Sequence, residues 1–110
     1  MASGHICSSY QSDPDFEELL VEFVQGVPDR VQAIRDAQRE NRSAVLSTLV
    51  HQLRGACGSY GFHEMTPSAA SLDEDLRAGI SLDALGTRID AFIDDCLRMT
   101  AGSEDGPVTN

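Results

Sequence analysis

His51 is the residue of this chain best suited to chemistry, because a neutral imidazole is a nucleophile near physiological pH. It begins the run His-Gln-Leu-Arg-Gly, in which Gln52 follows directly and Arg54 and Gly55 lie three and four residues on. Residues three and four apart share a helix face, so a guanidinium and a glycine would border the ring. A guanidinium keeps its charge and its fork matches phosphate oxygens, which indicates phosphoryl chemistry.

A helical wheel of residues 46–60 predicts where the imidazole points. At about 100° per residue, the apolar side chains of this segment fall within about 100° of arc. His51 lies roughly 150° from the centre of that stripe. We therefore expect His51 on the outward face and not packed in a core. The stripe consists of Leu46, Leu49, Val50, Leu53, Cys57 and Tyr60.

The helix face around His51 carries little side-chain bulk. Ser47, Gly55 and Gly58 lie on this face, and so does Ala44. An interior glycine costs a helix about 1 kcal/mol relative to alanine. A solvated face gains nothing from two such residues, whereas a protein that must approach the ring closely would benefit. The alternative is an exposed histidine without a function.

Apolar periodicity and helix-breaking residues predict five helices joined by short turns, and hence an up-down bundle. We expect the domain to cover residues 13–101, between flexible tails at 1–12 and 102–110. Gly61 and Gly79 are expected to end the third and fourth helices. The five helices are expected to begin at Asp13-Pro14, after the break Gly26-Val27-Pro28, at Asn41 or Ser43, at Thr66-Pro67 and at Ser81. The residues expected to face inward are Phe16, Leu19, Leu20, Phe23 and Val24 in the first helix, Val31, Ile34 and Ala37 in the second, and Leu82, Leu85, Ile89, Phe92, Ile93, Cys96 and Leu97 in the fifth.

Composition and charge exclude several classes of function. Eighteen acidic residues face eight arginines and no lysine, giving a net charge of −10. Such a surface repels nucleic-acid backbones and anionic membranes. No run reaches the roughly 20 apolar residues of a membrane span, and the N-terminus lacks the pattern of a secretory signal. The cytoplasm is therefore the expected compartment. The three cysteines have no metal-type spacing, and Cys57 and Cys96 are expected to be buried thiols.

The segment His51-Gln52-Leu53-Arg54-Gly55, with Gly61 ten residues after the histidine, resembles the signature H-x-L-K-G of the histidine-containing phosphotransfer (HPt) domain family. The resemblance extends over roughly residues 14–100 in length and helix layout. It implies an all-α fold, an up-down four-helix bundle with an additional N-terminal helix. Arg54 stands where the family has lysine, which keeps the charge but changes its geometry.

The resemblance also implies a function. His51 would accept a phosphoryl group from a receiver-domain aspartyl phosphate and pass it to another receiver. Partners would be response-regulator receiver domains, with a histidine kinase as a further candidate. Each expected helix has one apolar stripe, enough for one intramolecular core, so the chain is expected to be a monomer. No cofactor or metal of its own is implied, since Mg²⁺ belongs to the receiver. No autonomous kinase activity is expected.

HPt-like domains often place Gln or Glu on the next helix, 22 residues after the histidine and within reach of its ring. Asp73 stands at that position here and is one methylene shorter than Glu. If the fourth helix packs antiparallel to the third, the carboxylate would accept from Nδ1–H and leave Nε2 free. The alternative is a solvated carboxylate on an acidic helix.

Three other interpretations remain open. The dimerising histidine domain of sensor kinases has the motif H-E-L-R-T-P, but Gly55-Ala56 stands where Thr-Pro is expected. The chain could also be a phosphotransfer domain excised from a hybrid or chemotaxis-type kinase. A helical interaction module without phosphotransfer is the alternative from a different class. A metal or haem bundle is disfavoured, because His51 and His63 lie on different elements and no Glu-x-x-His pair projects inward.

Overall fold

The computed structural model describes residues 4–101 and contains four α-helices in that range. The helices are α1 (Glu17–Arg39), α2 (Ser43–Ser59), α3 (Thr66–Arg77) and α4 (Leu82–Leu97). A 3₁₀ turn, η1 (His63–Met65), precedes α3, and two short strands, β1 (Ile6–Cys7) and β2 (Met99–Thr100), flank the bundle.

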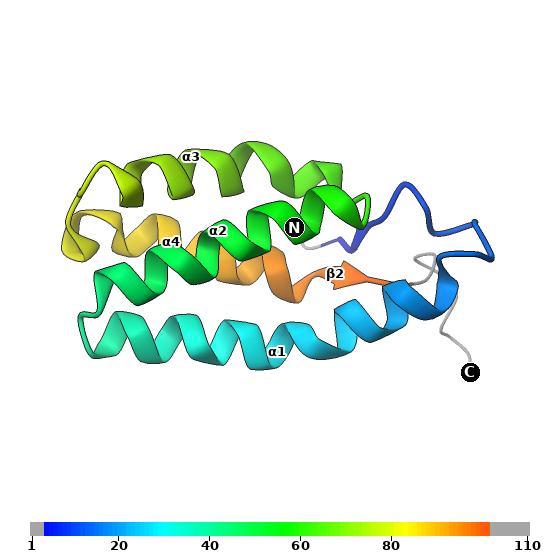
Figure 1. The fold of residues 1–110 in the computed structure, drawn as a ribbon, viewed down its shortest axis with the longest axis horizontal. Coiled ribbons are helices and arrows are strands. Elements are labelled where there is room, and N and C mark those ends of the chain that lie inside the picture. Colours follow the sequence, from blue (N-terminus) through cyan, green and yellow to red (C-terminus); the bar gives the residue numbers. More distant parts are fainter. Residues whose placement is uncertain (1–3, 102–110) are drawn as a thin grey trace.

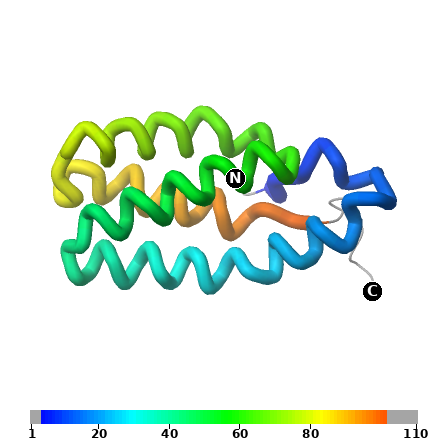
Figure 2. Tube along the Cα trace, in the orientation of Figure 1, coloured from blue at the N-terminus to red at the C-terminus, as the bar shows by residue number. Residues whose placement is uncertain are grey.

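The four helices run alternately up and down. α2 packs against α1 and α3, and α4 packs against the same two helices. Figures 1 and 2 show each connection returning the chain antiparallel to the helix before it, with both strands at one end of the bundle. The all-α up-down four-helix bundle is therefore confirmed.

α1 corrects the prediction of a break at Gly26-Val27-Pro28 and of an additional N-terminal helix. It is one helix of 23 residues with Pro28 inside it. An interior proline costs about 3 kcal/mol. Val27 and Val31 are buried on either side of it, and burying each valine contributes about 1.5–3 kcal/mol. The buried stripe continues through the proline, and this packing offsets the lost hydrogen bond.

Most of the predicted inward positions lie in the core. Val31, Ile34 and Ala37 are buried in α1, as are the first six of the seven predicted residues of α4. Leu19 and Leu97 correct the prediction, because they are 45% and 52% exposed. The adjacent residues Leu20 and Cys96 are the buried ones at these positions.

Glycine or asparagine ends three of the helices. Gly61 (φ 81°) and Gly79 (φ 86°) take the left-handed conformation directly after α2 and α3, as predicted. Asn41 (φ 56°) does the same after α1, so it ends that helix and does not cap α2. After each of these residues, the next backbone N–H bonds back into the last helical turn; for α2, Phe62 N–H donates to the Cys57 carbonyl at 2.8 Å.

Apart from the absent start after Pro28, the predicted helix starts are correct to within a few residues. Ser81 caps α4, its hydroxyl accepting from the Ala84 N–H at 3.2 Å. α3 begins at Thr66, as predicted, although Met65 precedes it as the capping position. Asp13-Pro14 lies in a turn, and α1 begins only at Glu17.

Residues 4–12 differ from the predicted flexible tail. β1 pairs in parallel with β2, Ile6 opposite Met99, and the Ile6 side chain is buried. The prediction of an N-terminal tail failed because three apolar residues, Ile6, Cys7 and Tyr10, in a short polar segment give no periodic signal. Residues 1–3 and the predicted C-terminal tail at 102–110 lie outside the described residues.

Candidate functional site

His51 lies on the outward face of α2, as the wheel predicts. Its side chain is 54% exposed, while Leu46, Val50 and Leu53 on the opposite face are buried. Within residues 4–101 its Nδ1 atom has one hydrogen-bond partner and its Nε2 atom has none. The ring therefore has one held nitrogen and one nitrogen available to another molecule.

The partner of Nδ1 is Asp73, on α3. Its Oδ2 lies 2.9 Å from His51 Nδ1, and its side chain is fully buried. Antiparallel packing of α3 against α2 brings the two residues level, and Leu72 and Leu76 anchor this part of α3 in the core. The sequence left two possibilities for Asp73: a contact with the His51 ring or a solvated carboxylate. The structure has the contact, and the Asp73 side chain is not solvated.

Arg54 lies beside the ring and shares its carboxylate. Arg54 Nη1 donates to Asp73 Oδ2 at 3.0 Å, and its Nη2 lies 3.9 Å from Oε2 of Glu74. The Arg54 side chain is 37% exposed, so its charge lies partly at the surface next to His51. This position lets one guanidinium serve both the buried carboxylate and an incoming anion.

Asp73 is ionised. Burial alone would raise the pKa of its carboxyl group, but the hydrogen bonds with His51 and Arg54 and the charge of Arg77 lower it below its ordinary value. An ionised carboxylate can only accept hydrogen bonds, so the proton between Asp73 and His51 lies on Nδ1. The lone pair of the neutral ring is then on Nε2.

The glycines beside His51 leave its surroundings open. A Cβ atom built at Gly55 or Gly58 would meet no atom within 4 Å. A shallow groove continues along α2 toward its N-terminus, lined by Ala44, Val45, Thr48, Leu49 and Gln52. Leu49, which was predicted to belong to the core stripe, is half-buried and borders this groove. The face thus offers small and apolar side chains around an accessible imidazole.

Comparison with known proteins decides the family. The sequence model of the Hpt domain matches residues 18–101. The chain belongs to the Hpt domain family. Searches of curated proteins and of solved structures found no match.

This family carries out histidine phosphotransfer in two-component signalling, and its members interact with receiver domains and kinases. Asp73 departs from the Gln or Glu expected in HPt-like domains. The shorter side chain still reaches the ring because α3 packs closely on α2 and Asp73 itself is buried.

Two residues that complete the charged cluster were not predicted as site residues: Arg77 and Glu74. Arg77 Nε lies 3.3 Å from Asp73 Oδ1, and Glu74 faces Arg54. The spacing of Arg77 four residues after Asp73 is a signal that could have identified the first contact.

The remaining candidate residues lie outside the cluster. His5 and His63 are exposed, and in the described part of the chain no three His, Cys, Asp or Glu residues are placed to hold a metal. Cys57 and Cys96 are buried thiols, as predicted. Burial, only partly opposed by the charge of Arg30, raises the pKa of Cys57 to about 11, which makes it a poor nucleophile.

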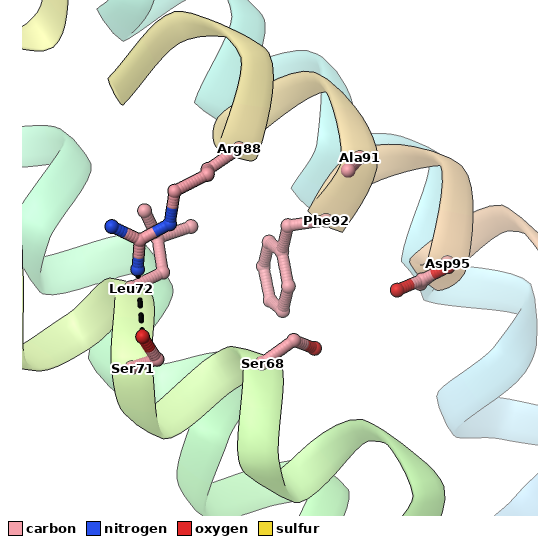
Figure 3. Close-up of a pocket in the computed structure, with 7 residues that line it drawn as sticks. All are labelled: Ser68, Ser71, Leu72, Arg88, Ala91, Phe92 and Asp95. Atoms are coloured by element: carbon pink, nitrogen blue, oxygen red, sulfur yellow. Dashed lines mark hydrogen bonds between the residues drawn. The ribbon is translucent and has the colours of Figure 1, made fainter. Parts of the chain in front are cut away.

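A second hollow lies between α3 and α4, away from His51. Figure 3 shows Phe92 at its centre, Ser68 and Ser71 on one side and Arg88 on the other. Arg88 donates to Ser71 Oγ at 2.7 Å and also pairs with Asp75. Its arginine is already paired and its lining contains no histidine, so this hollow lacks the chemistry of the His51 face.

The helices of the described residues include none that is long and apolar enough to span a membrane.

Proposed function

We propose that this Hpt domain is a phosphorelay intermediate in which His51 accepts a phosphoryl group from a receiver-domain aspartyl phosphate and passes it to another receiver. One observation carries the proposal. An exposed imidazole has its Nδ1 held at 2.9 Å by a fully buried carboxylate, which leaves Nε2 as the nucleophile.

The transfer step follows from this arrangement. The Nε2 lone pair forms the N–P bond while the bond from phosphorus to the aspartyl oxygen breaks, and its electron pair leaves on the receiver's carboxylate. Nδ1 keeps its proton, so the ring becomes positively charged and Asp73 offsets that charge. The partly exposed Arg54 faces the oxygens of the transferring group. The receiver supplies Mg²⁺, and the reverse reaction uses the same contacts.

The open surface supports a protein as the phosphoryl donor. Gly55 and Gly58 leave room above α2, and the groove from Ala44 to Gln52 adds an apolar contact area. Receiver domains bring both the phosphoryl group and a surface that can cover this face. We propose that the exchange takes place in the cytoplasm between monomers.

Labelling by a panel of phosphorylated receiver domains tests the proposal. We expect the acid-labile phosphate to map to His51 and to be lost in His51→Gln. His63→Gln is the matched control, since His63 is also exposed but lies on η1 without the glycine surround. Undiminished labelling of His51→Gln would contradict the proposal. Labelling by a kinase domain but by no receiver would favour a module excised from a chemotaxis-type kinase.

A further inference from the structure

Asp73 presents its two carboxylate oxygens to different partners. Oδ2 accepts from His51 Nδ1 at 2.9 Å and from Arg54 Nη1 at 3.0 Å. Oδ1 is buried and has no hydrogen bond among the described residues. Its nearest charged group is Nε of Arg77, at 3.3 Å, one helical turn further along α3.

An aspartate carboxylate does not hold its orientation by itself. Rotation about the Cβ–Cγ bond is broad and roughly two-fold, so either oxygen can point toward His51 or away from it. A buried oxygen without a partner also carries a desolvation penalty that favours rotation or protonation. A cation next to Oδ1 disfavours both rotation of the carboxylate and its protonation.

From this geometry we infer that Arg77 is a positioning residue for the transfer reaction, acting through Asp73. By pairing with Oδ1, Arg77 fixes the carboxylate plane that presents Oδ2 to Nδ1 of His51, and so fixes the tautomer with a free Nε2. Arg54 alone does not suffice, because it shares Oδ2 with the ring and leaves Oδ1 uncovered. The inference rests on the proposed function, in which His51 is the acceptor.

Arg77 also has a simpler structural contribution to make. It lies in the last turn of α3, where a cation interacts favourably with the helix dipole. That contribution changes stability but not the position of a proton on His51. The test therefore reads the ring directly.

Nitrogen NMR of the His51 ring in the free protein measures the tautomer. We expect the Nδ1–H form to dominate in wild type and to lose population in Arg77→Met, which keeps an apolar chain over Oδ1 without charge. Arg77→Lys should restore most of the Nδ1–H form. Arg88→Met is the matched control and should leave the ring unchanged. Arg88 pairs with Asp75 and donates to Ser71 at the α3–α4 hollow, away from His51; Figure 3 shows the Ser71 contact.

Transfer kinetics with a receiver that labels wild-type His51 complete the test. Arg77→Met should lower the maximal rate by about tenfold, as loss of a group that orients a functional histidine through a second residue does at metal sites. The half-saturating receiver concentration should not change. A rise in that concentration at an unchanged maximal rate would overturn the inference and make Arg77 a docking residue.

The ring measurement separates the two proposals. An unchanged tautomer in Arg77→Met, or a lysine variant no better than methionine, would overturn the role of Arg77 while leaving His51 as the acceptor. If Arg77 controls the tautomer but no receiver labels His51, the proposed function fails and the positioning contact stands.

Discussion

Two glycines, one within α2 and one just after it, lie in opposite surroundings. Gly55, beside His51, has open space where a Cβ atom would lie, and its backbone is helical. Gly61, just past the end of the same helix, has φ at 81°, and a Cβ there would lie 2.8 Å from side-chain atoms of Ser8, Ser9 and Tyr10. The first glycine leaves room for a partner molecule, whereas the second leaves room for the chain itself.

The contacts at Gly61 show what that second space is for. Ser9 N–H donates to the Gly61 carbonyl at 2.9 Å, and the buried Ser8 hydroxyl donates to the Tyr60 carbonyl at 2.6 Å. The N-terminal segment thus satisfies carbonyls at the end of α2 that the helix leaves free. Tyr60 in turn stacks on Phe23 of α1 at 4.7 Å between ring centroids. Glycine therefore lies at an open surface at position 55 and at a packed contact between the N-terminal segment and α2 at position 61.

The largest effect on stability is expected from Gly61→Ala. Left-handed backbone and the collision with residues 8–10 should together lower the free energy of unfolding by about 2 kcal/mol or more. Thermal or urea unfolding measures it. Gly86→Ala is the control, because Gly86 lies inside α4 and its Cβ would meet nothing within 4 Å. Equal stability of the Gly61 variant and wild type would show that the N-terminal segment does not pack as described.

Gly55→Gln is expected to raise stability and to slow phosphoryl transfer. A helix former in place of glycine should raise the free energy of unfolding by up to about 1 kcal/mol. A bulky side chain on the His51 face should at the same time block docking and slow phosphoryl transfer. Gly86→Gln makes the same change on α4 and should keep the transfer rate. Early melting of the Gly55 variant would instead mean that Gly55 packs closely against the protein.

Lowering the pH should reduce the contribution of Asp73, beside His51, to the free energy of unfolding, and should not change the contribution of Gly61. Burial raises the pKa of Asp73, but His51 and Arg54 from α2 and Arg77 from α3 outweigh burial and hold this pKa below its ordinary value in the folded protein. Its stabilisation is therefore complete above the pKa of the unfolded chain and is lost as the pH falls through the folded pKa.

The measurement is urea unfolding of wild type and Asp73→Asn between neutral pH and about pH 3. The advantage of wild type over Asp73→Asn should shrink as the pH falls. The penalty of Gly61→Ala should stay constant over the same range, since it is steric. A wild-type advantage that does not depend on pH would contradict the ionised state of Asp73.

No self-association is expected from either region. The larger exposed apolar side chains of the described residues are scattered over three helices and the turn before α4: Leu19 and Val21 in α1, Val45 in α2, Ile80 in the turn and Leu97 in α4. Sedimentation should therefore give a monomer at all micromolar concentrations, for wild type and for Gly55→Gln alike. A stable dimer would contradict this and would revive the interpretation as a dimerising histidine domain.

Local patterns in the sequence determined the parts of the structure that depend on neighbours along the chain. The outward direction of His51 follows from helical periodicity, as do the buried positions Val31, Ile34 and Ala37. Gly61, Gly79 and Ser81 mark helix ends because their effects act within one turn. These features were predicted correctly since hydrogen bonds between near neighbours fix them.

Only the tertiary structure decided the features that join distant segments. α1 continues through Pro28 because Val27 and Val31 are buried against other helices, a gain that no local rule contains. Residues 4–12 pack on the bundle because Ile6 pairs with Met99, more than 90 positions away. The state of Asp73 depends on α2 lying against α3, which buries its carboxylate and supplies His51 and Arg54 as partners. The sequence by itself selected the histidine, and the packing of α3 determined which of its two nitrogens is free.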